Sequence, residues 1–92
     1  MTIKNYEGKA KSLRMIMSSA PFLHGFQDVI DGRWTDVREE LAQWRYERGR
    51  MFAVWLRSKG QQIDRLKLKQ GRWIRQEFIN AYVMAKKEGS II

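Results

Sequence analysis

The chain has 92 residues, 43% of them hydrophobic, and its 18 Lys and Arg against 10 Asp and Glu leave a net charge of +8. A chain of this length can bury one small core, so we expect a single domain over residues 1–92. The sequence has no Cys, which excludes a disulfide framework and thiolate metal sites. No apolar signal-like run begins the chain, and no uncharged apolar stretch approaches the roughly 20 residues of a membrane span. We therefore expect a cytoplasmic protein with no membrane partner.

The first two helices are predicted from apolar spacing and from their end signals. Apolar residues separated by three and four positions predict a helix over residues 6–17. Pro21 fits the first turn of a second helix over residues 21–31, and Gly32 should end it, because glycine tolerates the left-handed conformation that follows a helix.

A long third helix is predicted over residues 36–58. Thr35 or Asp36 offers a side-chain oxygen to the free backbone donors at its start. Gly49 interrupts the apolar stripe of this helix, at a cost of about 1 kcal/mol relative to alanine. A glycine at that position predicts the close approach of another backbone or a ligand, or a kink.

The C-terminal third is predicted to contain one short extended segment and a last helix. Residues 62–69 alternate imperfectly between apolar and charged side chains, which is typical of a strand or an extended loop. The last helix is predicted over residues 73–87, where Lys86 and Lys87 end it before Gly89. The expected fold is therefore mainly α, with about four helices in one small basic domain.

The sequence offers little for catalysis. His24 is the one histidine, and we expect it to pack or to form a hydrogen bond rather than to act in catalysis. The seven glycines form no phosphate-binding loop pattern. We therefore expect a protein that is not an enzyme and that uses no metal and no cofactor.

Basic and aromatic residues are the strongest functional signal, and the tripeptide Gly-Arg-Trp occurs twice, at Gly32 and at Gly71. Exposed cations and aromatic rings are what nucleic-acid binding uses, through phosphate contacts and base stacking. The candidate contacts with nucleic acid or a partner are Arg33, Arg50, Arg57, Lys59, Arg65, Lys67, Lys69, Arg72 and Arg75. The possible stacking residues are Trp34, Tyr46 and Trp73. We expect the tryptophans of the two tripeptides first to cover the start of the following helix, and Trp44, Phe52 and Trp55 to lie in the core.

Two segments resemble the ribosome modulation factor family: His24 to Arg33, with the sequence HGFQDVIDGR, and Trp44 to Ala53, with the sequence WRYERGRMFA. The resemblance covers about residues 22–56. Members of that family are small, basic, mostly helical proteins that bind ribosomal RNA on the small subunit and silence ribosomes in slow growth. The resemblance implies an RNA contact at Arg33, and the positions that it carries over are Gly25, Phe26, Gly32, Arg33, Trp44 and Gly49.

The segment Tyr46 to Arg50 is also similar to small proteins of phages and mobile elements, which often inhibit host defence. Our leading hypothesis is a non-enzymatic accessory or inhibitor protein that docks on a large ribonucleoprotein complex through RNA phosphates and protein contacts. It includes ribosome modulation and phage-encoded inhibition of an RNA-guided, CRISPR-type defence complex. The alternatives are a DNA-binding regulatory protein of a phage or mobile element, and an interaction module for an acidic protein.

Overall fold

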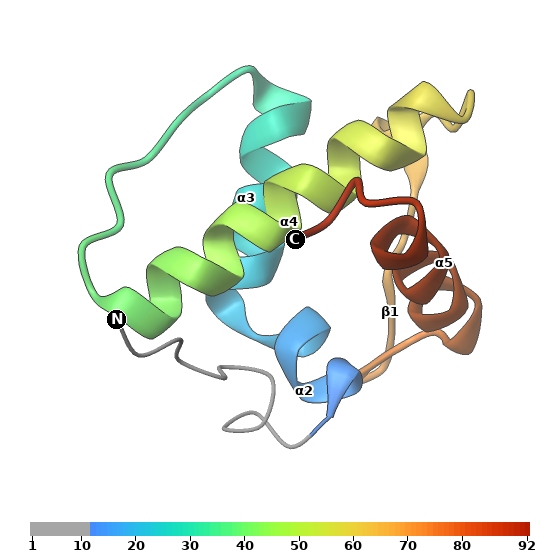
Figure 1. The fold of residues 1–92 in the computed structure, drawn as a ribbon, viewed down its shortest axis with the longest axis horizontal. Coiled ribbons are helices and arrows are strands. Elements are labelled where there is room, and N and C mark those ends of the chain that lie inside the picture. Colours follow the sequence, from blue (N-terminus) through green and yellow to red (C-terminus); the bar gives the residue numbers. More distant parts are fainter. Residues whose placement is uncertain (1–11) are drawn as a thin grey trace.

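The computed structural model describes residues 12–92, which form a mainly helical fold, as the sequence predicts. Figure 1 shows α4 crossing the molecule diagonally, with α3 against it and α5 near its C-terminal half. Residues 6–11 of the first predicted helix lie outside the described residues. The elements in chain order are α2 (Leu13–Ser18), α3 (Ala20–Asp31), α4 (Glu40–Ser58), the 3-10 turn η1 (Ile63–Arg65), β1 (Lys69–Gln70), β2 (Trp73–Ile74) and α5 (Gln76–Lys87).

Capping residues in the sequence determine the ends of α2 and α3. Ser12 precedes α2, and its hydroxyl accepts a hydrogen bond from the backbone N–H of Met15 at 3.2 Å. Pro21 lies in the first turn of α3, where the missing N–H is not needed. Gly32 ends α3 in the left-handed conformation, with a φ of 65°. The prediction for residues 21–31 is confirmed, with α3 beginning one residue earlier.

The predicted start of α4 is wrong, because the helix begins four residues later, at Glu40. The N-cap is Glu39 rather than Thr35 or Asp36. Two backbone N–H groups of the first turn donate hydrogen bonds to the Glu39 carboxylate, which hold its pKa below the ordinary value. Thr35 instead forms its hydrogen bonds with α3 and α4 side chains, so residues 33–38 form an irregular connection between the two helices.

The C-terminal third also differs from the prediction. The segment predicted as extended over residues 62–69 contains η1 and reaches a strand only at its last residue. β1 pairs with β2 in antiparallel register, with Gln70 opposite Trp73, and Gly71 turns the chain between them with a φ of 63°. Because Trp73 and its neighbour pair with β1, α5 begins at Gln76, three residues later than predicted.

Two glycines allow α3 and α4 to cross with their backbones in contact. A methyl group placed at Gly25 would lie 2.9 Å from the carbonyl carbon of Tyr46, and one at Gly49 would lie 2.9 Å from the carbonyl carbon of Phe22. Contacts this short essentially never occur for real side chains. Of the three explanations that the sequence left open for Gly49, the close approach of another backbone is therefore the right one.

The core lies between α3, α4 and α5. Phe52 of α4 is fully buried, and its ring centroid lies 6.1 Å from that of Phe22 in α3 and 5.8 Å from that of Tyr82 in α5. Trp55 is buried as predicted, whereas Trp44 is only partly buried. Over residues 12–92, no helix combines the length and apolar character that crossing a membrane requires.

Candidate nucleic-acid interface

A two-stranded ribbon between η1 and α5 carries a group of exposed basic residues. Leu68 and Ile74 are buried and anchor it to the core. The Arg14 guanidinium of α2 donates a hydrogen bond to the Ile74 carbonyl, and the Arg75 N–H donates to the Leu68 carbonyl at 2.9 Å. The first contact holds β2 against α2, and the second joins the residues that flank the two strands. We use the term basic ribbon for this hairpin and the segment that leads into it: Arg65 at the end of η1, Lys67 before β1, Lys69 in β1, Arg72 in the turn and Trp73 in β2.

The four cations of the basic ribbon are exposed to solvent. Within residues 12–92, no hydrogen bond or ion pair occupies their side chains. Asp64 is the one acidic residue between Arg57 and Arg75, against seven Lys and Arg in that stretch. The ribbon is therefore a surface of concentrated positive charge, which attracts polyanions.

Trp73 lies on the basic ribbon and is 51% exposed. It belongs to β2 and stands opposite Gln70, so the expectation that the last helix starts at Trp73 is wrong. About half of the Trp73 surface is therefore accessible to a ligand, and Arg72 precedes it directly in the turn. A cation beside a half-exposed indole can contact a phosphate and a neighbouring base together.

Three other predicted contacts have partners inside the fold. The Lys59 ammonium lies 3.1 Å from a carboxylate oxygen of Glu88. Arg75 forms an ion pair with Glu77 at 2.6 Å. Arg57 is exposed at the end of α4, but it donates a hydrogen bond to the Val29 carbonyl of α3 at 3.3 Å. These three residues stabilise the fold. Among the predicted contacts, which all lie within residues 12–92, Arg33 and the four cations of the basic ribbon are the ones whose side chains have no such partner.

Glu88, the partner of Lys59, also accepts a hydrogen bond from the indole N–H of Trp55 at 2.5 Å. The hydrogen bond from Trp55, followed by the one from Lys59, holds the pKa of the Glu88 carboxyl below its ordinary value. Glu88 directly follows α5, so these hydrogen bonds connect the end of α5 to the C-terminal half of α4.

Tyr46 is buried, so the prediction that it stacks on a base is wrong. Its hydroxyl donates a hydrogen bond to the Asp28 carboxylate at 2.6 Å and accepts one from the Thr35 N–H at 2.8 Å. The Thr35 hydroxyl donates to the same carboxylate at 2.7 Å, and His24 lies 3.4 Å from its other oxygen. The hydrogen bond from Tyr46 is the main reason that the pKa of Asp28 is lowered.

Asp28 is a buried polar residue that was not among the candidates predicted from the sequence. The available signal was a carboxylate between Phe26 and Val29 on the buried side of α3, since a buried charge is rarely found without partners. Its two hydrogen-bond donors lie seven and 18 residues away along the chain, so local spacing did not indicate them. Only the contact with His24, four residues earlier, has a spacing that the sequence shows.

The first Gly-Arg-Trp tripeptide lies on the other side of the molecule from the ribbon, in the connection between α3 and α4 (Figure 1). Arg50 donates a hydrogen bond to the Arg33 carbonyl at 2.6 Å, so it holds this connection in place. The Arg33 side chain is exposed. Trp34 is 70% exposed, which contradicts the expectation that it packs on the following helix. The two tripeptides share a left-handed glycine, at Gly32 and Gly71, but not a common surface.

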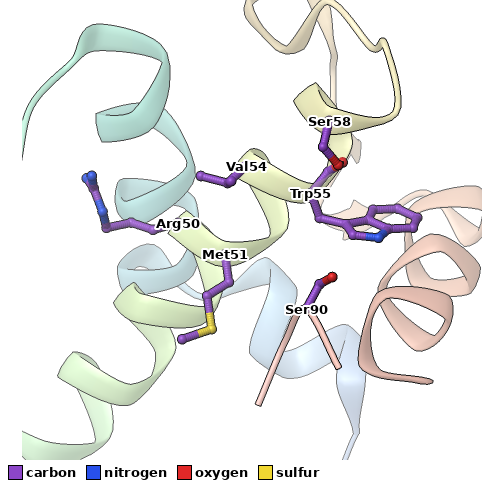
Figure 2. Close-up of a pocket in the computed structure, with 6 residues that line it drawn as sticks. All are labelled: Arg50, Met51, Val54, Trp55, Ser58 and Ser90. Atoms are coloured by element: carbon purple, nitrogen blue, oxygen red, sulfur yellow. The ribbon is translucent and has the colours of Figure 1, made fainter. Parts of the chain in front are cut away.

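A cavity of about 480 Å³ lies on the exposed side of α4. Figure 2 shows that the side chains of Met51, Val54 and Trp55 border it, while the Arg50 guanidinium extends away from Trp55. The remaining lining residues, Ser58 and Ser90, bring two hydroxyls and no titratable group. In the part of the chain that the structure describes, no three His, Cys, Asp or Glu residues come together as metal ligands.

The basic ribbon is thus the surface that geometry and charge select, with four exposed cations and one half-exposed indole on a scaffold held to the core. Arg33 and Trp34 are exposed and lie apart from the ribbon. Their backbone is held by hydrogen bonds from Arg50 to the Arg33 carbonyl and from the Thr35 N–H to the Tyr46 hydroxyl. No protein family model, curated protein or solved structure matches this chain.

Proposed function

We propose that this chain is a non-enzymatic accessory protein that docks on a large ribonucleoprotein complex, with the basic ribbon on the RNA. The observation that carries the proposal is the ribbon itself, where four exposed cations without partners among residues 12–92 and a half-exposed indole lie within ten residues of the chain. Cations in this arrangement neutralise phosphates, and an indole stacks on an unpaired base. Structured RNA presents both groups in its loops and bulges.

The resemblance to the ribosome modulation factor family supports the same class of target. The two resembling segments, residues 24–33 and 44–53, lie in α3, in the connection that follows it, and in α4. They include Gly25 and Gly49, the two glycines at which these helices cross. The shared glycines therefore have a physical role in the pairing of these helices.

The test is the affinity for a labelled RNA stem-loop, measured by fluorescence anisotropy over a range of KCl concentrations. If the four ribbon cations each neutralise one phosphate of the loop, log K should fall with log salt with a slope of about −3. Arg72→Gln should reduce that slope by about 0.7. Trp73→Ala should weaken binding by about 1–3 kcal/mol, roughly 5- to 150-fold, whereas Trp73→Phe should retain part of the stacking.

Lys87→Gln is the matched control. It removes the same charge from an exposed residue in the last turn of α5, outside the basic ribbon. Its salt slope should equal that of the unmodified chain. An affinity that does not respond to salt, or an equal loss in the Arg72 and Lys87 variants, would contradict the proposal.

Two biological roles agree with this proposal: modulation of ribosomes, and phage-encoded inhibition of an RNA-guided, CRISPR-type defence complex. Sedimentation of the tagged chain with ribosomal particles distinguishes them. Co-sedimentation with the small subunit supports the first role. Absence from every ribosomal fraction, together with inhibition of target cleavage by a purified defence complex, supports the second.

DNA binding is the second candidate, because a two-stranded ribbon with outward cations is one of the elements that enter the major groove of duplex DNA. A labelled duplex in the same titration tests it. Tighter binding of the duplex than of the stem-loop, with the same loss on Arg72→Gln, would select DNA. Competition by an acidic protein but not by RNA would instead identify an acidic protein partner.

A further inference from the structure

Gln70 is an exposed residue of the same hairpin as Trp73. The two residues stand opposite each other in the antiparallel pair of β1 and β2. Opposite residues of such a pair have their side chains on the same face, with Cβ atoms about 4.5–5.5 Å apart. Because both residues are exposed, the hairpin presents an amide and an indole side by side to solvent.

The side-chain amide of Gln70 has no partner in the described part of the fold. Among residues 12–92, no hydrogen bond engages it, whereas the exposed amide of Gln76 donates to Asn80 at 3.0 Å. A glutamine amide carries a carbonyl acceptor next to an NH₂ donor. It therefore matches a ligand that has a donor and an acceptor side by side.

Two cations of the basic ribbon flank this amide and indole along the chain. Lys69 directly precedes Gln70, and Arg72 directly precedes Trp73. Both cationic side chains are exposed and have no ion pair within residues 12–92. A nucleotide stacked on the indole therefore finds cations for its phosphates and an amide for the edge of its base.

Adenine is the base that matches a glutamine amide best. On the Hoogsteen edge, which faces the major groove in a duplex, adenine presents the N7 acceptor beside the N6 amino donor. Guanine presents two acceptors there, and each pyrimidine presents one polar group. On the Watson–Crick edge of an unpaired base, all four bases present a donor beside an acceptor, so that edge does not discriminate between them. Adenine alone satisfies the amide on either edge, and as a purine it also covers more of the indole than a pyrimidine does.

We propose that Gln70 and Trp73 form a binding site for one unpaired adenine of an RNA, with the base stacked on the indole and its edge bonded to the amide. This inference rests on the proposed function, in which the basic ribbon binds RNA. It adds the base that the site selects and the residue that selects it. Gln70 was not among the candidates predicted from the sequence, because the strand register, rather than the spacing along the chain, places it opposite Trp73.

Four RNA stem-loops that differ in one loop nucleotide test this selection. Each loop is uridine except at one position, which is adenine, guanine, cytosine or uridine, and the affinity for the full chain is measured by fluorescence anisotropy at one KCl concentration. The adenine loop should bind about 5- to 150-fold more tightly than each of the others, the discrimination typical of a bidentate contact. Replacing adenosine with purine riboside, which lacks the N6 amino group, should remove most of that preference.

Gln70→Ala should remove the preference for adenine and leave the salt dependence unchanged, because no charge is lost. Gln70→Glu replaces the amide donor with a second acceptor, which suits the Watson–Crick edge of guanine, where N1–H and the N2 amino group both donate. The preference should therefore move from adenine to guanine. Unfolding cannot produce that change, since it would weaken the binding of all four RNAs alike. Gln43→Ala is the matched control, because it removes an exposed amide in α4, outside the hairpin, and should keep the preference.

Four results would overturn the inference. Salt-dependent binding with equal affinity for the four RNAs would exclude base selection and leave the proposed function in place. A preference for adenine that survives Gln70→Ala would place the selection elsewhere, and a preference of the unmodified chain for another base would exclude adenine as the ligand. The absence of salt-dependent binding to any of the four RNAs would overturn both this inference and the proposed function.

Discussion

Replacing Gly25 or Gly49 with alanine puts a methyl group into the backbone crossing of α3 and α4. At each position the methyl carbon would clash with a carbonyl oxygen of the other helix and would lie 2.9 Å from its carbonyl carbon, whereas ordinary contacts begin at 3.4 Å. The helices must therefore separate by more than about 0.5 Å, and a gap of that size already removes about a quarter of the dispersion energy across it. The obstacle is backbone, so no side-chain rotation relieves it.

The expected loss of unfolding free energy is the difference between two opposing effects of the substitution. Overpacking of a tight site destabilises a protein by about 1–3 kcal/mol, and the rigid obstacle places these sites at or above the upper end of that range. Replacing a helix-interior glycine with alanine returns about 1 kcal/mol. Each variant should therefore lose about 2 kcal/mol of unfolding free energy, which lowers Tm by about 8–16 °C for a domain of this size.

Urea and thermal unfolding followed by circular dichroism measure this loss. Gly60→Ala is the control, because Gly60 has a φ of 84° and nothing within 4 Å of the added methyl group, so it should lose only about 1 kcal/mol through backbone strain. The double variant Gly25→Ala and Gly49→Ala should lose less than the sum of the single losses, since the helices separate only once. A Gly49→Ala protein as stable as the unmodified chain would refute the reasoning.

Two further predictions concern buried polar contacts. Tyr46→Phe removes the main hydrogen bond that lowers the pKa of Asp28 below its ordinary value of 3.8, so it should lose about 1.5–3 kcal/mol at neutral pH. Because a lowered folded-state pKa stabilises the fold above the unfolded value, this loss should shrink as the pH falls below 3.8, and a pH-independent difference in Tm would contradict the assignment. Arg48 is 8% exposed, donates to the carbonyls of Trp44 and Ile92 at 3.3 and 3.0 Å, and lies 4.6 Å from the Trp44 ring centroid. Arg48→Ala should therefore lose about 1–3 kcal/mol in urea unfolding, and Arg48→Gln should lose less if hydrogen bonding rather than charge is the main contribution.

Local signals predicted the parts of the fold that depend on neighbours in the sequence. Pro21 and Gly32 determine the ends of α3 within one residue, because each acts through the conformation of its own backbone. The start of α4 was predicted wrongly because Thr35, a suitable cap, hydrogen-bonds instead to Asp28 and Tyr46. Those contacts are tertiary, and the spacing of residues along the chain does not contain them.

The candidate site also has some features that the sequence determines and others that only the tertiary structure decides. The sequence by itself determined that the cations are concentrated between residues 57 and 75 and that a glycine turn precedes each Arg-Trp pair. Only the tertiary structure decided which cations are free, because Lys59 and Arg75 have carboxylate partners whereas the four cations of the basic ribbon have none within residues 12–92.

The tertiary structure also gave the two identical tripeptides different surroundings. Both turn at a left-handed glycine, which is a property of the local backbone that the sequence already contains. The chain then carries Trp73 into a positive ribbon and Trp34 into the irregular connection between α3 and α4, on opposite sides of the molecule. The burial and the electrostatic environment of each tryptophan depend on segments that are distant in sequence. Local sequence patterns therefore do not determine them, and only the tertiary structure does.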